Sequence, residues 1–182
     1  MILVYVNSSN GLSKAALETV TYAKKLGNEV VVLTNGKASS ESLTCLGEYG
    51  ATKVLVDRMV DGEDSQQLTR LISAVVQNIG AKTVIFSHDL IGKAVAPRLS
   101  VRLQAGLIAG AISIPDTDGA VKVNVFSGKA IGNVKVSSAI KIISLLPNSI
   151  QPEKTGANCP VEETNGLGST TGKNALSRIC LI

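Results

Sequence analysis

Four short apolar segments divide the first half of this chain at regular intervals, and each is continuous rather than alternating. An unbroken apolar run of this length is typical of a strand that is buried on both faces of a sheet. Each run is followed by a segment whose apolar residues recur at helical spacing, and the first three of these segments end at a glycine, where helices commonly stop. The predicted strands are residues 2–6, 29–34, 53–57 and 82–87, and the predicted helices are residues 12–26, 40–49, 68–79 and 91–104.

This alternation of strands and helices requires right-handed crossovers between parallel strands. The sequence therefore predicts an α/β fold with three layers, in which a doubly wound, mainly parallel sheet is covered by helices on both faces. The fourth predicted helix contains Pro97, which removes one backbone hydrogen bond. That helix either kinks at the proline or begins near it.

The pattern changes after Gly106. Asp118-Gly119 is a hairpin signal, and residues 121–125 after it alternate between apolar and polar side chains. Residues 134–136 and 140–142 repeat this alternation, so we expect additional short, partly antiparallel strands in the C-terminal third. From Pro147 onward the chain is rich in Pro, Gly, Asn, Ser and Thr. We therefore expect one domain over residues 1–147, followed by a linker or tail over 148–182 that is partly disordered.

Composition excludes several classes of function. The net charge is only +4, no run of five like charges occurs and aromatic residues make up 3%, so nucleic-acid binding is not expected. Cys45, Cys159 and Cys180 are widely spaced and His88 is the sole histidine, which argues against a metal site or a disulfide framework. No apolar stretch approaches the roughly 20 residues of a membrane helix, so we expect no membrane insertion and a cytoplasmic protein.

Three segments could bind a ligand, and each has a simpler explanation. Residues 166–174 resemble a phosphate-binding loop but lack its glycine spacing and its Ser or Thr after Lys173. Residues 7–11 could hold an anion or could cap the next helix, and capping is commoner. His88 and Asp89 follow the fourth strand and could move protons or could cap the helix after it. We expect no catalytic, cofactor-binding or metal-binding residues in this chain.

Three motifs in register resemble a known family. Residues 92–106 are similar to the Gly-Lys/Arg-x-x-x-Pro-Arg-x-Ala/Ser-x-x-Leu helix of electron-transfer-flavoprotein alpha subunits, and residues 125–130 resemble that family's Ile-Tyr-Ala-Gly-Asn-Ala turn. Residues 10–18 resemble its Asp-Gly-x-Leu opening. The chain departs from the family at Lys129, where Asn is usual, and at Val123, where Arg is usual. The resemblance covers about residues 1–146 and implies the adenine nucleotide alpha hydrolase-like version of the predicted fold.

The resemblance implies that this chain is the N-terminal domain of an electron carrier. FAD would be bound by a C-terminal domain with a Ser-Gly-Gly-Arg loop, which this sequence lacks. The partner would be a beta subunit that holds AMP, the donor an acyl-CoA dehydrogenase-type enzyme, and the acceptor a quinone oxidoreductase or another protein. The domain itself would be a scaffold that docks the beta subunit. Candidate residues for that interface are Arg98, Arg102, Phe126 and Lys129.

Two other functions remain open. One is a stand-alone adenine-nucleotide-binding module of the universal-stress-protein type, but residues 87–98 contain a single glycine, Gly92, where that type has a glycine-rich phosphate loop. The other is a small hydrolase or transferase, for which the sequence offers no nucleophile paired with a base.

Overall fold

The computed structural model describes residues 1–8, 11–27, 29–36, 38–60, 64–156 and 158–164. Its sheet has nine strands in the order β7-β6-β5-β8-β4-β1-β2-β3-β9. The strands are β1 (Ile2–Asn7), β2 (Val30–Asn35), β3 (Lys53–Asp57), β4 (Thr83–Ser87), β5 (Gly106–Ala111), β6 (Ala120–Val125), β7 (Ala130–Lys135), β8 (Lys141–Leu145) and β9 (Val161–Glu163). The helices are α1 (Lys14–Leu26), α2 (Ser40–Thr44), η1 (Cys45–Tyr49), α3 (Ser65–Ile79), α4 (Leu90–Leu103) and the short turn η2 (Phe126–Gly128).

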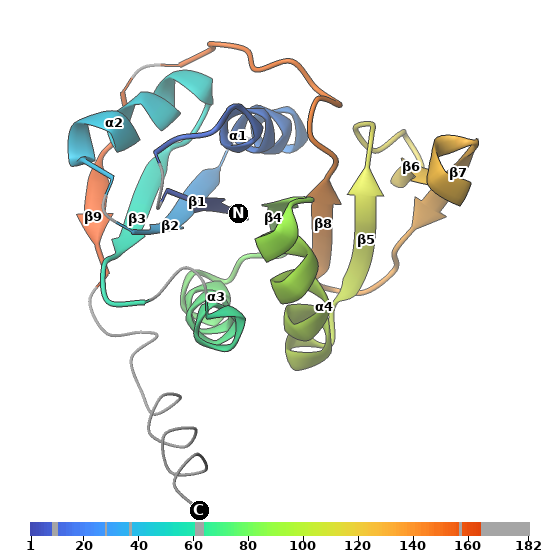
Figure 1. The fold of residues 1–182 in the computed structure, drawn as a ribbon, viewed down its shortest axis with the longest axis horizontal. Coiled ribbons are helices and arrows are strands. Elements are labelled where there is room, and N and C mark those ends of the chain that lie inside the picture. Colours follow the sequence, from blue (N-terminus) through green and yellow to red (C-terminus); the bar gives the residue numbers. More distant parts are fainter. Residues whose placement is uncertain (9–10, 28, 37, 61–63, 157, 165–182) are drawn as a thin grey trace, which may run out of the picture.

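The predicted fold class is confirmed. The seven strands from β9 to β5 pair in parallel, whereas β6 pairs antiparallel with both β5 and β7. Figure 1 shows α1 and α2 on one face of the sheet and α3 and α4 on the other, which gives the three expected layers. The four strands and four helices predicted in the first half are all present, with boundaries shifted by a few residues; the helix expected over residues 40–49 is divided between α2 and η1.

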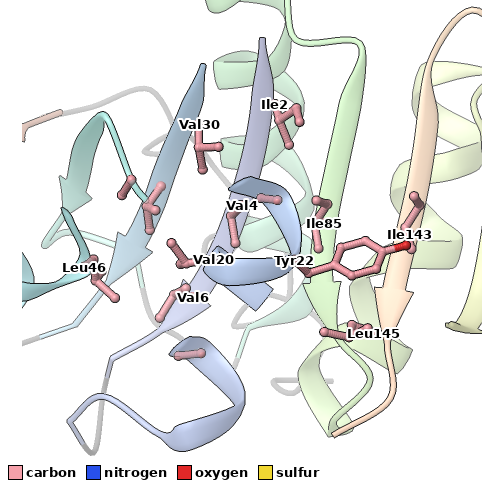
Figure 2. Packing of buried hydrophobic residues seen from close by; sticks show 14 of the residues in the cluster. Ile2, Val4, Val6, Val20, Tyr22, Val30, Leu46, Ile85, Ile143 and Leu145 are labelled. Atoms are coloured by element: carbon pink, nitrogen blue, oxygen red, sulfur yellow. The ribbon is translucent and has the colours of Figure 1, made fainter. Parts of the chain in front are cut away.

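Each face of the sheet has its own hydrophobic core. Val20 of α1 and the strand residues Val4 and Ile85 are fully buried between the helix and the sheet. Figure 2 shows the ring of Tyr22 extending from α1 toward Ile143 of β8. The Tyr22 hydroxyl donates a hydrogen bond of 3.1 Å to the carbonyl oxygen of Ser113, and burial raises the pKa of Tyr22 to about 12. This aromatic side chain therefore ties the first helix to the second half of the chain.

Helix α4 begins at Leu90, so the alternative that it begins near Pro97 is wrong. Pro97 lies inside the helix and is exposed, and the residues around it remain helical. The helix ends at Gln104, which adopts a left-handed conformation with φ of 51°. A proline on the solvent side loses one backbone hydrogen bond but displaces no core side chain.

Two expectations for the second half need correction. The alternation at residues 140–142 belongs to β8, which is a central parallel strand between β4 and β5 rather than a half-exposed antiparallel one, and β5 itself was not predicted. Residues 148–156 and 158–164, assigned to a linker or tail, run back along the α1 side and add β9 to the edge of β3 (Figure 1). We call these residues, together with Pro147, the return segment. The remainder of the expected tail, residues 165–182, lies outside the described residues.

Candidate functional site

A shallow cleft opens at the carboxyl ends of β1 and β4. These neighbouring strands form the switch point of the sheet, because the chain passes from β1 to β2 on one side and β4 lies on the other. Doubly wound sheets bind ligands at such a point. Two helix N-termini, those of α1 and α4, also reach this cleft. Its lining is Tyr5, Val6, Asn7, Ser13, Ala16, Thr19, Phe86, Ser87, Asp89 and Gly92.

A network of hydrogen bonds fills the sheet edge beside the cleft. The Tyr5 hydroxyl donates to Asn35 Oδ1 at 2.6 Å, and the Ser8 hydroxyl donates to the Asn35 carbonyl oxygen at 2.6 Å. Thr34 in turn donates to the Ser8 hydroxyl at 2.8 Å. Burial, followed by the nearby charge of Asp89, raises the pKa of Tyr5 well above its usual value. Tyr5 is therefore neutral at neutral pH and donates its hydroxyl hydrogen bond to Asn35.

The anion site that the strand ends could have offered is occupied by the protein's own carboxylate. Asp89 is the N-cap of α4, and its Oδ1 accepts the Gly92 amide at 2.8 Å. A negative charge at this position repels phosphate, and it has already taken a donor that a phosphate would use. The capping role expected for Asp89 is confirmed. On the α1 side the cap is Ser13, whose hydroxyl accepts the Ala16 amide at 3.2 Å, and not a residue of the 7–11 turn.

His88 forms a contact within the domain. Its Nδ1 lies 2.9 Å from the hydroxyl of Ser144, which also accepts the Gly110 amide at 3.2 Å. Partial burial and then the positive charge of Lys93 lower the pKa of His88, and Asp89 opposes them. Ser144 is only 2% exposed, so the serine hydroxyl of this pair is shielded from solvent. We read the contact as a link between β4, β5 and β8.

The four candidate interface residues lie on two separate elements. Arg98 and Arg102 are on α4, where Arg98 donates to the Ser65 hydroxyl at 2.5 Å and Arg102 donates to the Ser73 hydroxyl at 3.2 Å. Both arginines thus tie α4 to α3. Phe126 and Lys129 lie at the turn between β6 and β7. Figure 1 shows this hairpin at the opposite edge of the sheet from β9.

Several exposed residues on the β6–β7 hairpin are not among the candidates predicted from the sequence. Ile131 is 63% exposed, and Lys122 and Lys135 are exposed on the same face of the two strands. The alternation over residues 121–125 was the available signal, because it already implied one solvent-facing side.

No group of three or more potential metal ligands occurs in the described part of the chain. Among the same residues, no helix is long and apolar enough to cross a membrane.

These features define a class: a doubly wound α/β domain with a cleft at its switch point, where Asp89 caps the N-terminus of α4. A family model described as the electron transfer flavoprotein domain matches residues 2–166. The chain belongs to the electron transfer flavoprotein family, as the N-terminal domain of an alpha subunit.

Similar proteins agree with this assignment. The electron transfer flavoprotein subunit alpha of Bacillus subtilis is 32% identical over 127 residues, which cover 68% of this chain and 39% of the relative. The subunit alpha of Syntrophomonas wolfei is 26% identical over 171 residues, which cover 91% of this chain and 51% of the relative. A probable mitochondrial subunit alpha of Caenorhabditis elegans is 24% identical over 164 residues, 88% of this chain and 49% of the relative. The chain spans about half the length of the curated relatives it matches.

Proposed function

We propose that this chain is the scaffolding domain of an electron carrier and docks a beta-type subunit of the same family. The complete protein would carry electrons from an acyl-CoA dehydrogenase-type donor to a quinone oxidoreductase or another acceptor, in the cytoplasm. The chain would itself catalyse no reaction. The observation that carries this proposal is the family match over residues 2–166.

FAD would be held by residues outside this chain, because the described residues do not fit it. The flavin cofactor carries a pyrophosphate, which calls for backbone amides at a helix N-terminus. At the switch point the N-terminus of α4 presents the Asp89 carboxylate instead. The same argument weighs against the stand-alone adenine-nucleotide module, although the position of the cleft is the one that such a module would use.

The experiment is to purify the 182-residue chain alone and together with the beta-type subunit from its source organism. We expect the chain alone to show no flavin absorbance and no heat of binding with AMP or ATP, and to form a one-to-one complex with the beta-type subunit by light scattering. Stoichiometric FAD on the chain alone would contradict the placement of the cofactor. Micromolar ATP binding without complex formation would favour the nucleotide-binding module.

A further inference from the structure

Ion pairs are distributed unevenly over this molecule. Every ion pair found among the described residues joins two groups outside residues 90–145, and four of them fasten the return segment to the body of the domain. Residues 90–145 contain two acidic residues, Asp116 and Asp118, and no glutamate. They also contain seven basic residues: Lys93, Arg98, Arg102, Lys122, Lys129, Lys135 and Lys141. One half of the sheet therefore carries a positive charge that the described residues do not neutralise by ion pairs.

The β6–β7 hairpin concentrates this charge around exposed apolar side chains. Phe126 at its turn is 79% exposed and Ile131 on β7 is 63% exposed. Val121 and Val123 face the core, so the alternate residues Lys122 and Asn124 face away from it, and the strand register places Ile131, Asn133 and Lys135 on that same outer face. Lys129 lies at the same turn as Phe126, and Lys122 and Lys135 lie further along the two strands. An exposed aromatic side chain with lysines beyond it is typical of an interface anchor with a charged rim.

The turn that carries Phe126 has an unfavourable backbone conformation. Phe126, Ser127 and Gly128 have φ of 52°, 56° and 83°, and the first two are residues for which a left-handed conformation is unfavourable. Such strain persists where it serves a function. Strand β7 is also the last strand on its side of the sheet, so one row of its backbone groups has no neighbouring strand in the described chain.

We propose that the β6–β7 hairpin is the docking element of this domain, and that its occupant is a different polypeptide whose surface offers an apolar socket for Phe126 surrounded by Asp and Glu carboxylates. A second copy of this chain does not fit, because its hairpin would bring lysines against lysines. A duplex nucleic acid, whose bases are already stacked on one another, would leave the aliphatic side chain of Ile131 without an apolar partner. This inference rests on the proposed function, in which the occupant is the beta-type subunit.

The test compares matched substitutions on the hairpin and on α4. Phe126→Asn removes the ring while tolerating the left-handed backbone, Phe126→Tyr keeps the ring, and Lys129→Glu reverses the rim charge. The controls are Leu90→Asn and Lys93→Glu on α4, whose side chains are also exposed. Each variant of the chain is titrated with the beta-type subunit by calorimetry at 50 mM and 500 mM NaCl, after its circular dichroism spectrum and melting temperature are shown to match the parent chain.

We expect Phe126→Asn to weaken binding by about tenfold or more at both salt concentrations. We expect Lys129→Glu to weaken it by about threefold or more at 50 mM NaCl and by less at 500 mM, since screening removes the rim contribution. Phe126→Tyr and the two α4 controls should stay within about twofold of the parent, which is less than the tenfold loss expected for a buried anchor.

Three results would overturn the inference. If the parent chain binds the subunit but the hairpin variants bind equally well, the docking element lies elsewhere and the proposed function stands. If Lys93→Glu loses as much affinity as Lys129→Glu, the attraction is a property of net charge, and if Leu90→Asn loses as much as Phe126→Asn, the hairpin is not the apolar anchor. If the parent chain binds duplex DNA or phosphatidylserine vesicles through the hairpin and does not bind the subunit, both the inference and the proposed function fail.

Discussion

The buried carboxylate of Glu18 accepts the backbone amide of Asn148 at 2.8 Å, although the two residues are 130 positions apart in the chain. Glu18 is on α1 and only 1% exposed, and its other oxygen lies 3.6 Å from the ammonium of Lys14. Lys14 in turn donates to the side chain of Asn148 at 3.1 Å. This triad fixes the point at which the chain leaves β8 and turns back over α1.

Glu18→Ala should therefore destabilise the domain by about 1–3 kcal/mol, because it leaves the Asn148 amide without its acceptor. The measurement is urea unfolding followed by circular dichroism. Glu18→Gln is the control, since its amide oxygen can still accept the Asn148 amide and its cost should therefore be smaller. Equal losses for the two variants would show that the buried hydrogen bond carries no special weight.

Gly92→Ala should destabilise the domain more than an ordinary glycine substitution in an element. A Cβ atom at this position would lie 1.9 Å from the carbonyl oxygen of Ser87, so β4 and α4 would have to move apart. The expected loss is about 1–3 kcal/mol or more in the free energy of unfolding, measured by chemical denaturation. Gly132→Ala is the matched control, because its Cβ would meet only ordinary contacts at 3.6 Å. A stable Gly92→Ala variant would contradict the close approach of strand and helix.

His88 should titrate below the usual histidine pKa of 6.5, because partial burial and Lys93 both oppose its protonation. The unfolded chain then binds more protons than the native domain around and below pH 6.5, so stability is full above that pH and falls as the pH is lowered. Proton NMR can follow this titration directly, since the chain has a single histidine. Replacing His88 with Asn should flatten the pH dependence of the melting temperature between about pH 7 and 5. A native pKa above 6.5 would reverse the sign and refute the prediction.

The ion pair between Lys53 and Glu162 should hold β9 against β3. Their charged atoms are 2.6 Å apart, and both side chains are substantially exposed. Lys53→Glu should weaken the pairing by about 0.2–1 kcal/mol, the usual range for an exposed pair. Hydrogen exchange of the peptide containing residues 158–164 should consequently accelerate up to about fivefold at low salt. The swapped variant Lys53→Glu with Glu162→Lys should restore slow exchange; if it does not, the pair contributes nothing to the return segment.

Much of the first half of the fold could be read from the sequence. Continuous apolar runs such as Val30 to Leu33 have one stable solution, which is a strand covered on both faces, and the helical spacing between the runs supplies the cover. The Asp118-Gly119 hairpin signal and the capping role of Asp89 are likewise local, because turn geometry and an N-cap depend on a few adjacent residues.

The position of the last strands could not be read in this way. The short segments that form β8 and β9 do not reveal which strand they pair with. Strand β8 pairs with β4 at residues 58 positions apart, and β9 pairs with β3 at residues 107 positions apart. The candidate site shows the same division. The sequence nominated Arg98, Arg102, Phe126 and Lys129 together, whereas the structure puts two of them against serines of α3 and two on an exposed turn.

By itself, then, the sequence determined the layered α/β arrangement and the identity of each early strand and helix, because burial pattern and capping act over one turn or one strand length. Only the tertiary structure decided the order of the strands, the pairing of β9 in the return segment with β3 and which side chains face solvent. Those outcomes depend on contacts between residues far apart in the sequence. A local pattern of apolar and polar residues does not specify which distant segment will pack against it.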